Sequence, residues 1–315
     1  MTAQLLRGVT HAEYHADAFE GSPRFSRSIA VRLLQQSPLH AWAAHPKLGG
    51  QAVEEPEEDA QVQARLERGS LIHDLLLGSG AELVEIHIHG DKKKGQDPSR
   101  LYPAPSYATK EARALRDAAR ARGAIPVIPD KLEEAYGAAE GIKKRLRLYG
   151  IHLEAFEPEA TALWDSGFVA SKARMDLLNL GLGEVLDLKV VDRISIRAFE
   201  AGVERYGLDV QAAAYTEAVE TCHPAIAGRI SFEFLLVERL PPHDVAIVPL
   251  SPALVDLGGQ KWRRARGIWA RCLESGAWPG FGRVEPIEAK PWQLEAELVH
   301  MASGSESAFN KIAPE

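Results

Sequence analysis

The sequence predicts an α/β protein in which helices and strands share one large folded unit. Residues 150–191 and 229–250 have strand-like patterns, whereas most of the remaining periodic segments have apolar residues at helical spacing. The composition agrees with this class, because a chain of 315 residues with 45% hydrophobic and 26% charged residues can bury a substantial core. This composition excludes a wholly disordered chain.

The first half of the chain is predicted to be mainly helical after a mixed, partly extended start. We expect four helices there, at residues 26–34, 60–77, 108–123 and 130–148. Pro38 stops the first of these helices and Gly78 ends the second. The acidic segment 49–59 and the segment 90–105 are predicted to be loops.

The second half is predicted to contain strands separated by two helices. The expected strands are at 169–178, 184–191, 229–238 and 244–250. The expected helices are at 209–222 and 252–275, and the second has a basic face. The chain has no internal repeat, and the tail after about residue 300 is polar.

Composition also limits the kind of protein and its location. Cys222 and Cys272 are too few for a four-cysteine zinc or iron–sulfur site or for a disulfide framework, so a reducing, cytoplasmic setting is expected. No apolar run approaches 18 residues and the start lacks a signal-like apolar region, so we expect no membrane association. The net charge of −7, taken alone, argues against nucleic-acid binding.

The most informative segment is the predicted hairpin over residues 174–191. A turn centred between Gly181 and Leu182 makes the numbers of opposed residues sum to 363, so that Asp176 faces Asp187 and Lys189 points to the same side. Opposed carboxylates repel each other unless a cation neutralises them, and hard oxygen ligands suit Mg²⁺ or Mn²⁺. The alternative interpretation is a surface hairpin with a cross-strand salt bridge.

Two pairs of residues one helical turn apart could add to such a site. Gly69 and His73 lie on one helix face, where the glycine would let another backbone approach the imidazole. His73 is then either a core histidine bonded to a carbonyl or a metal ligand. Gln211 and Tyr215 either orient the lysine or a phosphate, or form the polar edge of a core helix.

Taken in order, these motifs resemble the PD-(D/E)XK nuclease superfamily. The order GSLIH (69–73), ARMD (173–176), DLK (187–189) and QAAAY (211–215) is similar to RecB-like and RecE-like exonucleases. The wider resemblance, over roughly residues 25–282, is to the RecE (exonuclease VIII) C-terminal nuclease domain. It includes residues 26–46, 232–252 and 269–281, and matches poorly over 80–170.

The resemblance implies a restriction-endonuclease-like α/β core, with a central mixed β-sheet flanked by helices, that hydrolyses DNA with Mg²⁺. It implies that metal is bound by His73, Asp176, Asp187 and the backbone carbonyl of Leu188. It makes Lys189 the residue that activates water, with Gln211 and Tyr215 in support. We assign no role to Glu157 or Glu159. The implied division is a segment 1–25, a single nuclease domain 26–282 and a tail 283–315.

The resemblance also implies how the nuclease would act. The first hypothesis is a 5′–3′ exonuclease on linear duplex DNA that feeds single-strand annealing recombination, with an annealing recombinase as partner and a homo-oligomeric ring as assembly. The alternatives are a RecB-like nuclease with single-strand or endonucleolytic action, and an inactive nuclease-derived DNA-binding protein. Intact Asp176, Asp187 and Lys189 argue against the inactive form.

Basic clusters would supply the DNA-binding surface despite the net negative charge. The preferred cluster is Lys261, Arg263, Arg264 and Arg266, because the resemblance extends across it. Residues 143–147 and 92–94 contain other clusters, and each of the three is otherwise a solvated helix face or loop. The charge of −7 is therefore interpreted as an average over opposing regions, with DNA binding local and salt-sensitive.

Overall fold

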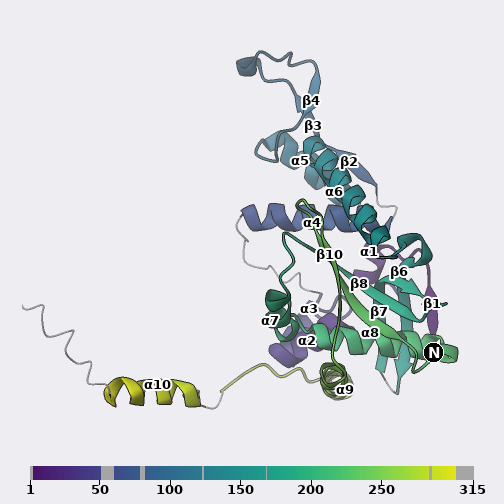
Figure 1. The fold of residues 1–315 in the computed structure, drawn as a ribbon, viewed down its shortest axis with the longest axis vertical. Helices are drawn as coiled ribbons and strands as arrows, with labels where there is room; N and C mark the ends of the chain where they lie inside the picture. Colours follow the sequence, from purple (N-terminus) through teal and green to yellow (C-terminus); the bar gives the residue numbers. More distant parts are fainter. Residues whose placement is uncertain are drawn as a thin grey trace, which may run out of the picture. The chain divides into compact units, whose positions relative to one another are not determined.

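The computed structural model describes residues 3–50, 60–78, 82–122, 124–167, 169–283 and 286–302 (Figure 1). The chain divides into two compact units, Met1–Trp278 and Pro279–Glu315. The second unit contains the helix α10 (Pro291–Ala302), which lies inside the segment predicted as a tail. The predicted loop over 49–59 lies almost wholly outside the described residues.

A mixed sheet of six strands forms the centre of the first unit. In spatial order its strands are β1 (Gln4–Leu6), β6 (Glu157–Ser166), β7 (Val169–Asn179), β8 (Glu184–Val191), β9 (Ser231–Glu238) and β10 (Val245–Pro249). Neighbouring strands are antiparallel except for the parallel pair β8 and β9. The predicted α/β class with a central mixed sheet is confirmed.

The parallel pair requires a long crossover between its two strands. The crossover consists of α7 (Ile196–Tyr206) and α8 (Leu208–Cys222). Ser195 caps the start of α7 by accepting a hydrogen bond from the Ala198 amide, and Gly207 ends it with a left-handed backbone at φ 61°. The crossover thereby brings α8 across the sheet, where it contacts β6, β7 and β9.

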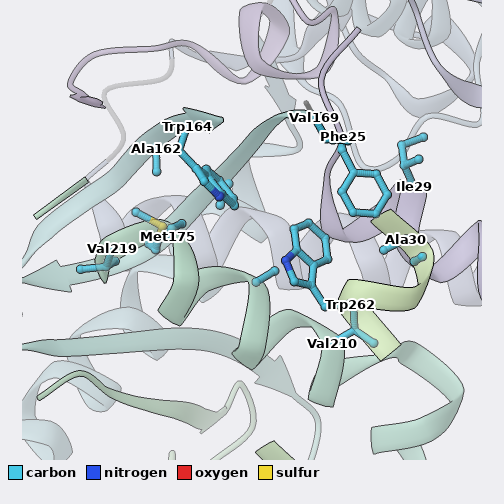
Figure 2. Close-up of a cluster of buried hydrophobic side chains, with 14 of the residues drawn as sticks. Phe25, Ile29, Ala30, Ala162, Trp164, Val169, Met175, Val210, Val219 and Trp262 are labelled. Atoms are coloured by element: carbon cyan, nitrogen blue, oxygen red, sulfur yellow. The ribbon is translucent and has the colours of Figure 1, made fainter. Parts of the chain in front are cut away.

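One face of the sheet is covered by α2 (Arg27–Gln35), α3 (Pro38–Ala44), α8 and α9 (Pro252–Ser275). Aromatic side chains fill this layer, and the Phe25 and Trp262 rings stack with centroids 4.5 Å apart (Figure 2). Gly258 lets α9 approach α8 closely, because a Cβ there would lie 2.1 Å from the Asp209 carbonyl oxygen. The aromatic core and this close contact fix α8 against the sheet.

The opposite face is covered by α4 (Ala60–Leu77) and α6 (Pro129–Leu148) (Figure 1). Their apolar residues, among them Ile72 and Ile142, pack with Leu186, Leu188 and Leu235 of the sheet. The sheet is therefore buried on both faces, which explains why β8 is apolar on both sides of Asp187.

Residues 82–127 form a smaller group of elements outside the six-stranded sheet. It contains β2 (Leu83–Glu85), β3 (His87–His89), β4 (Leu101–Pro103), α5 (Lys110–Ala121) and β5 (Ile125–Val127), with β2 paired to β5 and β3 to β4. The predicted loop at 90–105 thus includes a short strand, besides the 3₁₀ turn at Lys92–Lys94. The predicted helices at 26–34, 60–77, 108–123, 130–148, 209–222 and 252–275 are confirmed.

The amino-terminal segment is integrated into the first unit. Its strand β1 pairs with β6, and the short helix α1 (His11–His15) follows. Asp17 is fully buried and accepts a hydrogen bond from the Arg24 amide at 3.0 Å while pairing with Lys172 of β7 at 3.1 Å. Lys172 also donates to the Tyr14 carbonyl at 2.6 Å, so this charged cluster attaches α1 to the sheet.

Candidate active site

The predicted hairpin forms with the expected register. Leu177 pairs with Leu186, Leu178 with Val185 and Asn179 with Glu184, so the opposed numbers sum to 363. Gly183 has φ 73°, and a Cβ there would lie 2.8 Å from the Arg229 carbonyl oxygen, so glycine suits this turn on two grounds. Counted from the turn, the β7–β8 pairing in the described residues ends at Leu177 and Leu186, so Asp176 and Asp187 are the first residues beyond it.

The two strands part at the aspartates because β7 changes the face that it presents. Met175 packs on the α8 side, whereas Leu177, two residues later, packs on the α4 side. Regular strand alternation would place both residues on one face. In β6 the register position opposite Asp176 belongs to Glu159, which has φ 52°, a value that non-glycine residues rarely adopt. This irregularity opens the sheet around Asp176.

Asp176 fills the opening with contacts from two directions. Its Oδ2 accepts a hydrogen bond from the Leu188 amide at 2.8 Å. The same oxygen lies 3.4 Å from His73 Nε2 of α4. His73 Nδ1 lies 4.0 Å from Asp74, so the imidazole sits between two carboxylates. The structure therefore brings together His73 and Asp176, which the sequence separates by about a hundred residues.

Asp187 is held by groups on the α8 side of the sheet. Its side chain is 2% exposed, and its two oxygens contact the Lys189 ammonium and the Gln211 amide nitrogen. Tyr215, one turn further along α8, packs edge-on against Phe232. Asp187 and Lys189 thus share a face as predicted, and Gln211 is the member of the α8 pair that contacts the aspartate.

The fold shifts the pKa values of the two aspartates in opposite directions. Burial and the negative charge of Asp176 raise the pKa of Asp187, although the Lys189 ammonium partly opposes this. Burial also acts to raise the pKa of Asp176, but the contacts with His73, Lys189 and the Leu188 amide outweigh it, so the pKa is lowered. Burial opposes protonation of His73, yet its contacts with Asp176 and Asp74 raise its pKa to about 10. Burial raises the pKa of Tyr215 well above 10, so its phenol stays neutral.

A cleft of about 790 Å³ opens beside these residues. Its lining includes His73 and Asp74 of α4, residues of β8 from Leu188 to Val191, and the segment that follows β8. Gly69 also lines the cleft, and a Cβ there would have no described atom within 4 Å. The expectation that Gly69 allows a close backbone approach is therefore wrong, because this helix face borders open space.

Sequence reasoning missed three residues of this cleft. His11 of α1 lines it, and burial and the nearby Arg174 guanidinium lower the pKa of that histidine. Glu159 lines it too and pairs with Arg174 at 2.5 Å, while Asp74 contributes from α4. The only sequence signal for Asp74 is its position beside His73, and nothing in the sequence places His11 or the irregular backbone of Glu159 next to the hairpin.

A divalent cation fits this donor set by chemistry. The predicted ligands are two carboxylates, an imidazole and a carbonyl, and the buried Oε1 of Gln211 has no hydrogen-bond partner among the described residues. The raised pKa of Asp187 likewise indicates a carboxylate short of positive charge. Within the described ranges, however, no three His, Cys, Asp or Glu side chains are gathered as a metal site. Asp187 instead contacts Lys189 and Gln211.

The predicted DNA-binding cluster lies on α9, which packs against α8 and α2. Two of its four members are engaged within the fold, since Lys261 pairs with Asp209 at 2.7 Å and Arg266 with Glu217 at 2.5 Å. The Glu217 carboxylate also accepts hydrogen bonds from the indole nitrogens of Trp164 and Trp262. Arg263 and Arg264 have no ion pair among the described residues, and DNA binding by this cluster stays a prediction.

Comparison with known proteins identifies a family domain in the second half of the chain. Residues 158–289 match the model of a family described as a PDDEXK-like domain of unknown function. The matched range includes Asp176, Asp187, Lys189 and the Gln211/Tyr215 pair, but not His73. No curated protein matches the chain.

The fold is also similar to that of a solved structure. A crystal structure described as an exonuclease from Eubacterium rectale superposes with a TM-score of 0.52 at 13% identity, covering 90% of this chain and 96% of its own. The crystal structure of a phage-related exonuclease from Haemophilus somnus 129PT has a TM-score of only 0.29 at 10% identity, with 83% of this chain and 99% of that chain covered.

The match to a PDDEXK-like domain supports a nuclease. No helix within the described part of the chain is long and apolar enough to span a bilayer. The opened hairpin and its supporting helix α8 lie inside the matched range. The PDDEXK-like domain of residues 158–289 therefore confirms the resemblance of this chain to the PD-(D/E)XK superfamily.

Proposed function

We propose that the chain is a divalent-metal-dependent DNA exonuclease that hydrolyses phosphodiester bonds from duplex ends. The observation that carries the proposal is the meeting of four elements at one opening of the sheet. Asp176 of β7, Asp187 and Lys189 of β8, His73 of α4 and Gln211 of α8 are linked there by direct contacts. Charged and polar groups are costly to bury, so their gathering at one place inside the fold indicates a functional site.

Mg²⁺ is the proposed metal, with Mn²⁺ as the other hard cation that suits these ligands. His73, Asp176, Asp187 and the carbonyl of Leu188 would hold it. When bound, such a cation lowers the pKa of a water molecule and stabilises charge on phosphate oxygens. For His73 to bind, its imidazole must lose the proton that Asp176 and Asp74 favour, so metal and proton compete for this residue.

Lys189 is the proposed water-positioning residue. Its ammonium contacts the Asp187 carboxylate and lies 5.9 Å from the centroid of the Phe234 ring. These neighbours orient the side chain while leaving it about a third exposed, at the lining of the cleft. From there it can offset negative charge on a phosphate. Gln211 fixes the Asp187 carboxylate, and the phenol of Tyr215, one turn further along α8, stays neutral.

The finer details of the proposal rest on the resemblance to RecE-like nucleases. They are 5′–3′ polarity, cooperation with a single-strand annealing recombinase, a ring-shaped homo-oligomer and a cytoplasmic location. Residues 26–282 would form the nuclease domain. The competing candidate is a RecB-like nuclease that acts on single strands or internally, and the same site chemistry would serve it.

Digestion of labelled DNA tests the proposal. Linear duplexes labelled at the 5′ or the 3′ end and a covalently closed circle are incubated with Mg²⁺, or with EDTA instead. We expect nucleotides to be released from linear DNA alone and only with the cation. Early release of the 5′ label would support 5′–3′ polarity, whereas cleavage of the circle would favour the endonucleolytic candidate.

Matched variants separate the site from the rest of the surface. Asp187→Ala and Lys189→Ala are expected to abolish cleavage. The controls are Asp117→Ala and Lys110→Ala, at exposed positions of α5 outside the cleft. Full activity of either site variant would refute the assignment, as would an equal loss in the controls.

A further inference from the structure

Two arginines extend the basic wall of the cleft beyond Lys189. Arg193 follows β8 by two residues, and Arg239 directly follows β9. The Arg239 amide donates to the Val191 carbonyl at 2.9 Å, which continues the parallel ladder past the end of β9. Both side chains line the same cleft as Lys189 and His73. They therefore stand at the carboxyl edge of two adjacent strands, along one side of the candidate site.

Acidic partners hold each arginine in place. Arg239 Nε donates to Asp192 at 2.5 Å. Arg193 Nη1 lies 3.2 Å from Glu238 Oε2 and also donates to the carbonyls of Leu240 and Pro241. Glu238 is buried, and its second oxygen accepts a hydrogen bond from the Ile194 amide at 2.9 Å. The two guanidinium groups are thus oriented before any ligand arrives, which reduces the entropy lost on binding.

Each arginine keeps donors to spare. A guanidinium group has five N–H donors, and the contacts above use one nitrogen of each side chain. Among the described residues, no partner is bonded to Nε and Nη2 of Arg193 or to the two terminal nitrogens of Arg239. Arg193 is 54% exposed, so its donors are within reach of a ligand in the cleft.

The acidic residues of the cleft lining have cationic partners of their own. Glu159 pairs with Arg174 at 2.5 Å, and Asp74 lies beside His73, whose raised pKa of about 10 keeps it cationic. The spare guanidinium donors of Arg193 and Arg239 are therefore the part of this lining best suited to bind an anion. Planar guanidinium forks match the geometry of phosphate oxygens.

We propose that Arg193 and Arg239 bind phosphate groups of the nucleic-acid strand that lies against Lys189. The inference rests on the proposed function and names the surface that holds its substrate. This surface is separate from the basic cluster on α9, and a variant of that cluster is included in the same experiment.

The test measures binding without cleavage. A fluorescent duplex is titrated in EDTA over a series of salt concentrations with wild-type protein, Arg193→Gln, Arg239→Gln and the double variant. Each lost phosphate contact should reduce the slope of log affinity against log salt by about 0.9. We expect about that reduction for each single variant and about twice it for the double variant, whereas Arg193→Lys keeps most of the slope because it keeps the charge.

Controls make the outcome decisive. Arg113→Gln, on the exposed side of α5, should leave the slope unchanged. Thermal unfolding of each variant confirms that it is folded, and if one glutamine variant is not, the other single variant still tests the inference. Duplexes with 5′-phosphate and 5′-hydroxyl ends separate two sources of phosphate: equal losses assign the arginines to internal phosphodiesters, and a loss restricted to phosphorylated ends assigns them to the terminal phosphate.

Wild-type slopes for Arg193→Gln and Arg239→Gln on both duplexes would overturn the inference. So would a reduction found only in variants of α9, such as Arg263→Gln. Because EDTA removes the divalent cations that cleavage is proposed to need, this result is independent of catalysis. The proposed function fails separately, if Asp187→Ala retains Mg²⁺-dependent cleavage.

Discussion

The Asp176 carboxylate accepts a hydrogen bond from the Leu188 amide at 2.8 Å, across the gap where the β7–β8 ladder has ended. A side chain thus replaces a backbone carbonyl as the partner of a strand amide. The replacement satisfies a buried donor that the parting of the strands would otherwise leave unbonded. It also fixes one oxygen of Asp176 beside His73. The opening of the sheet and the position of its acidic group therefore have one structural cause.

Neutralising the two aspartates should change stability in opposite directions. The folded environment lowers the pKa of Asp176, so its charge stabilises the fold above that pKa, and Asp176→Asn should cost about 1.5–3 kcal/mol through weakened hydrogen bonds. The pKa of Asp187 is raised, so its charge is unfavourable at neutral pH, and Asp187→Asn should increase the free energy of unfolding. Urea unfolding at pH 7 in EDTA measures both. A loss of stability in Asp187→Asn equal to that in Asp176→Asn would contradict this account.

The contact between His73 and Asp176 should make stability depend on pH in the alkaline range. The pKa of His73 is about 10 in the fold, above its ordinary value of 6.5. Its stabilising contribution is therefore complete below pH 6.5 and is lost as the pH rises through 10. In EDTA, the wild type should lose more stability between pH 7 and pH 10 than His73→Gln does. If NMR gave His73 a titration midpoint near pH 6.5, its ordinary pKa, the contact with Asp176 would be absent in solution.

The hydrogen bond from Gln211 to Asp187 should matter more than the Tyr215 hydroxyl. Gln211→Ala removes a donor to a buried carboxylate, and the loss of such supporting partners costs roughly 10–100-fold in metal affinity or activity. Tyr215→Phe removes a hydroxyl with no hydrogen bond to a described residue and should have a smaller effect. Metal affinity from calorimetry and cleavage rates measure the two variants. A larger loss in Tyr215→Phe would mean that the hydroxyl, and not the amide, supports the site.

Two glycines of α9 provide a matched test of how α8 is positioned. Gly258→Ala places a methyl group where the Asp209 carbonyl oxygen stands 2.1 Å away, so it should separate the helices and destabilise the protein by roughly 1–3 kcal/mol. Gly267→Ala meets nothing closer than 3.7 Å and should be neutral or stabilising by up to about 1 kcal/mol. Thermal unfolding compares them. Equal stability of the two variants would exclude the close contact.

The parts of the site that the sequence predicts are those with local causes. The hairpin register follows from the turn glycines and the apolar residues on each side of Asp176 and Asp187, and it is confirmed. The helix α7 had local signals that our prediction omitted, because Ser195 begins it and Gly207 ends it. Such residues determine structure within a few positions of themselves.

The remaining features depend on contacts between distant segments. His11 reaches the cleft because the buried Asp17 and Lys172 attach α1 to the sheet. The face change at Asp176 accompanies the left-handed backbone of Glu159, which no residue pattern encodes. Lys261 and Arg266 look like free surface charges in the sequence, but Asp209 and Glu217 of α8 bind them in the fold.

Cleavage of end-labelled linear duplex DNA by wild type and Asp187→Ala, with and without Mg²⁺, tests the central claim most directly. Asp187 contacts both Lys189 and Gln211 and is a proposed metal ligand, so metal binding and the position of Lys189 both depend on it. We predict Mg²⁺-dependent release of nucleotides by the wild type and none by the variant, while both remain folded. Equal release by the two proteins, or wild-type release undiminished in EDTA, would contradict the account.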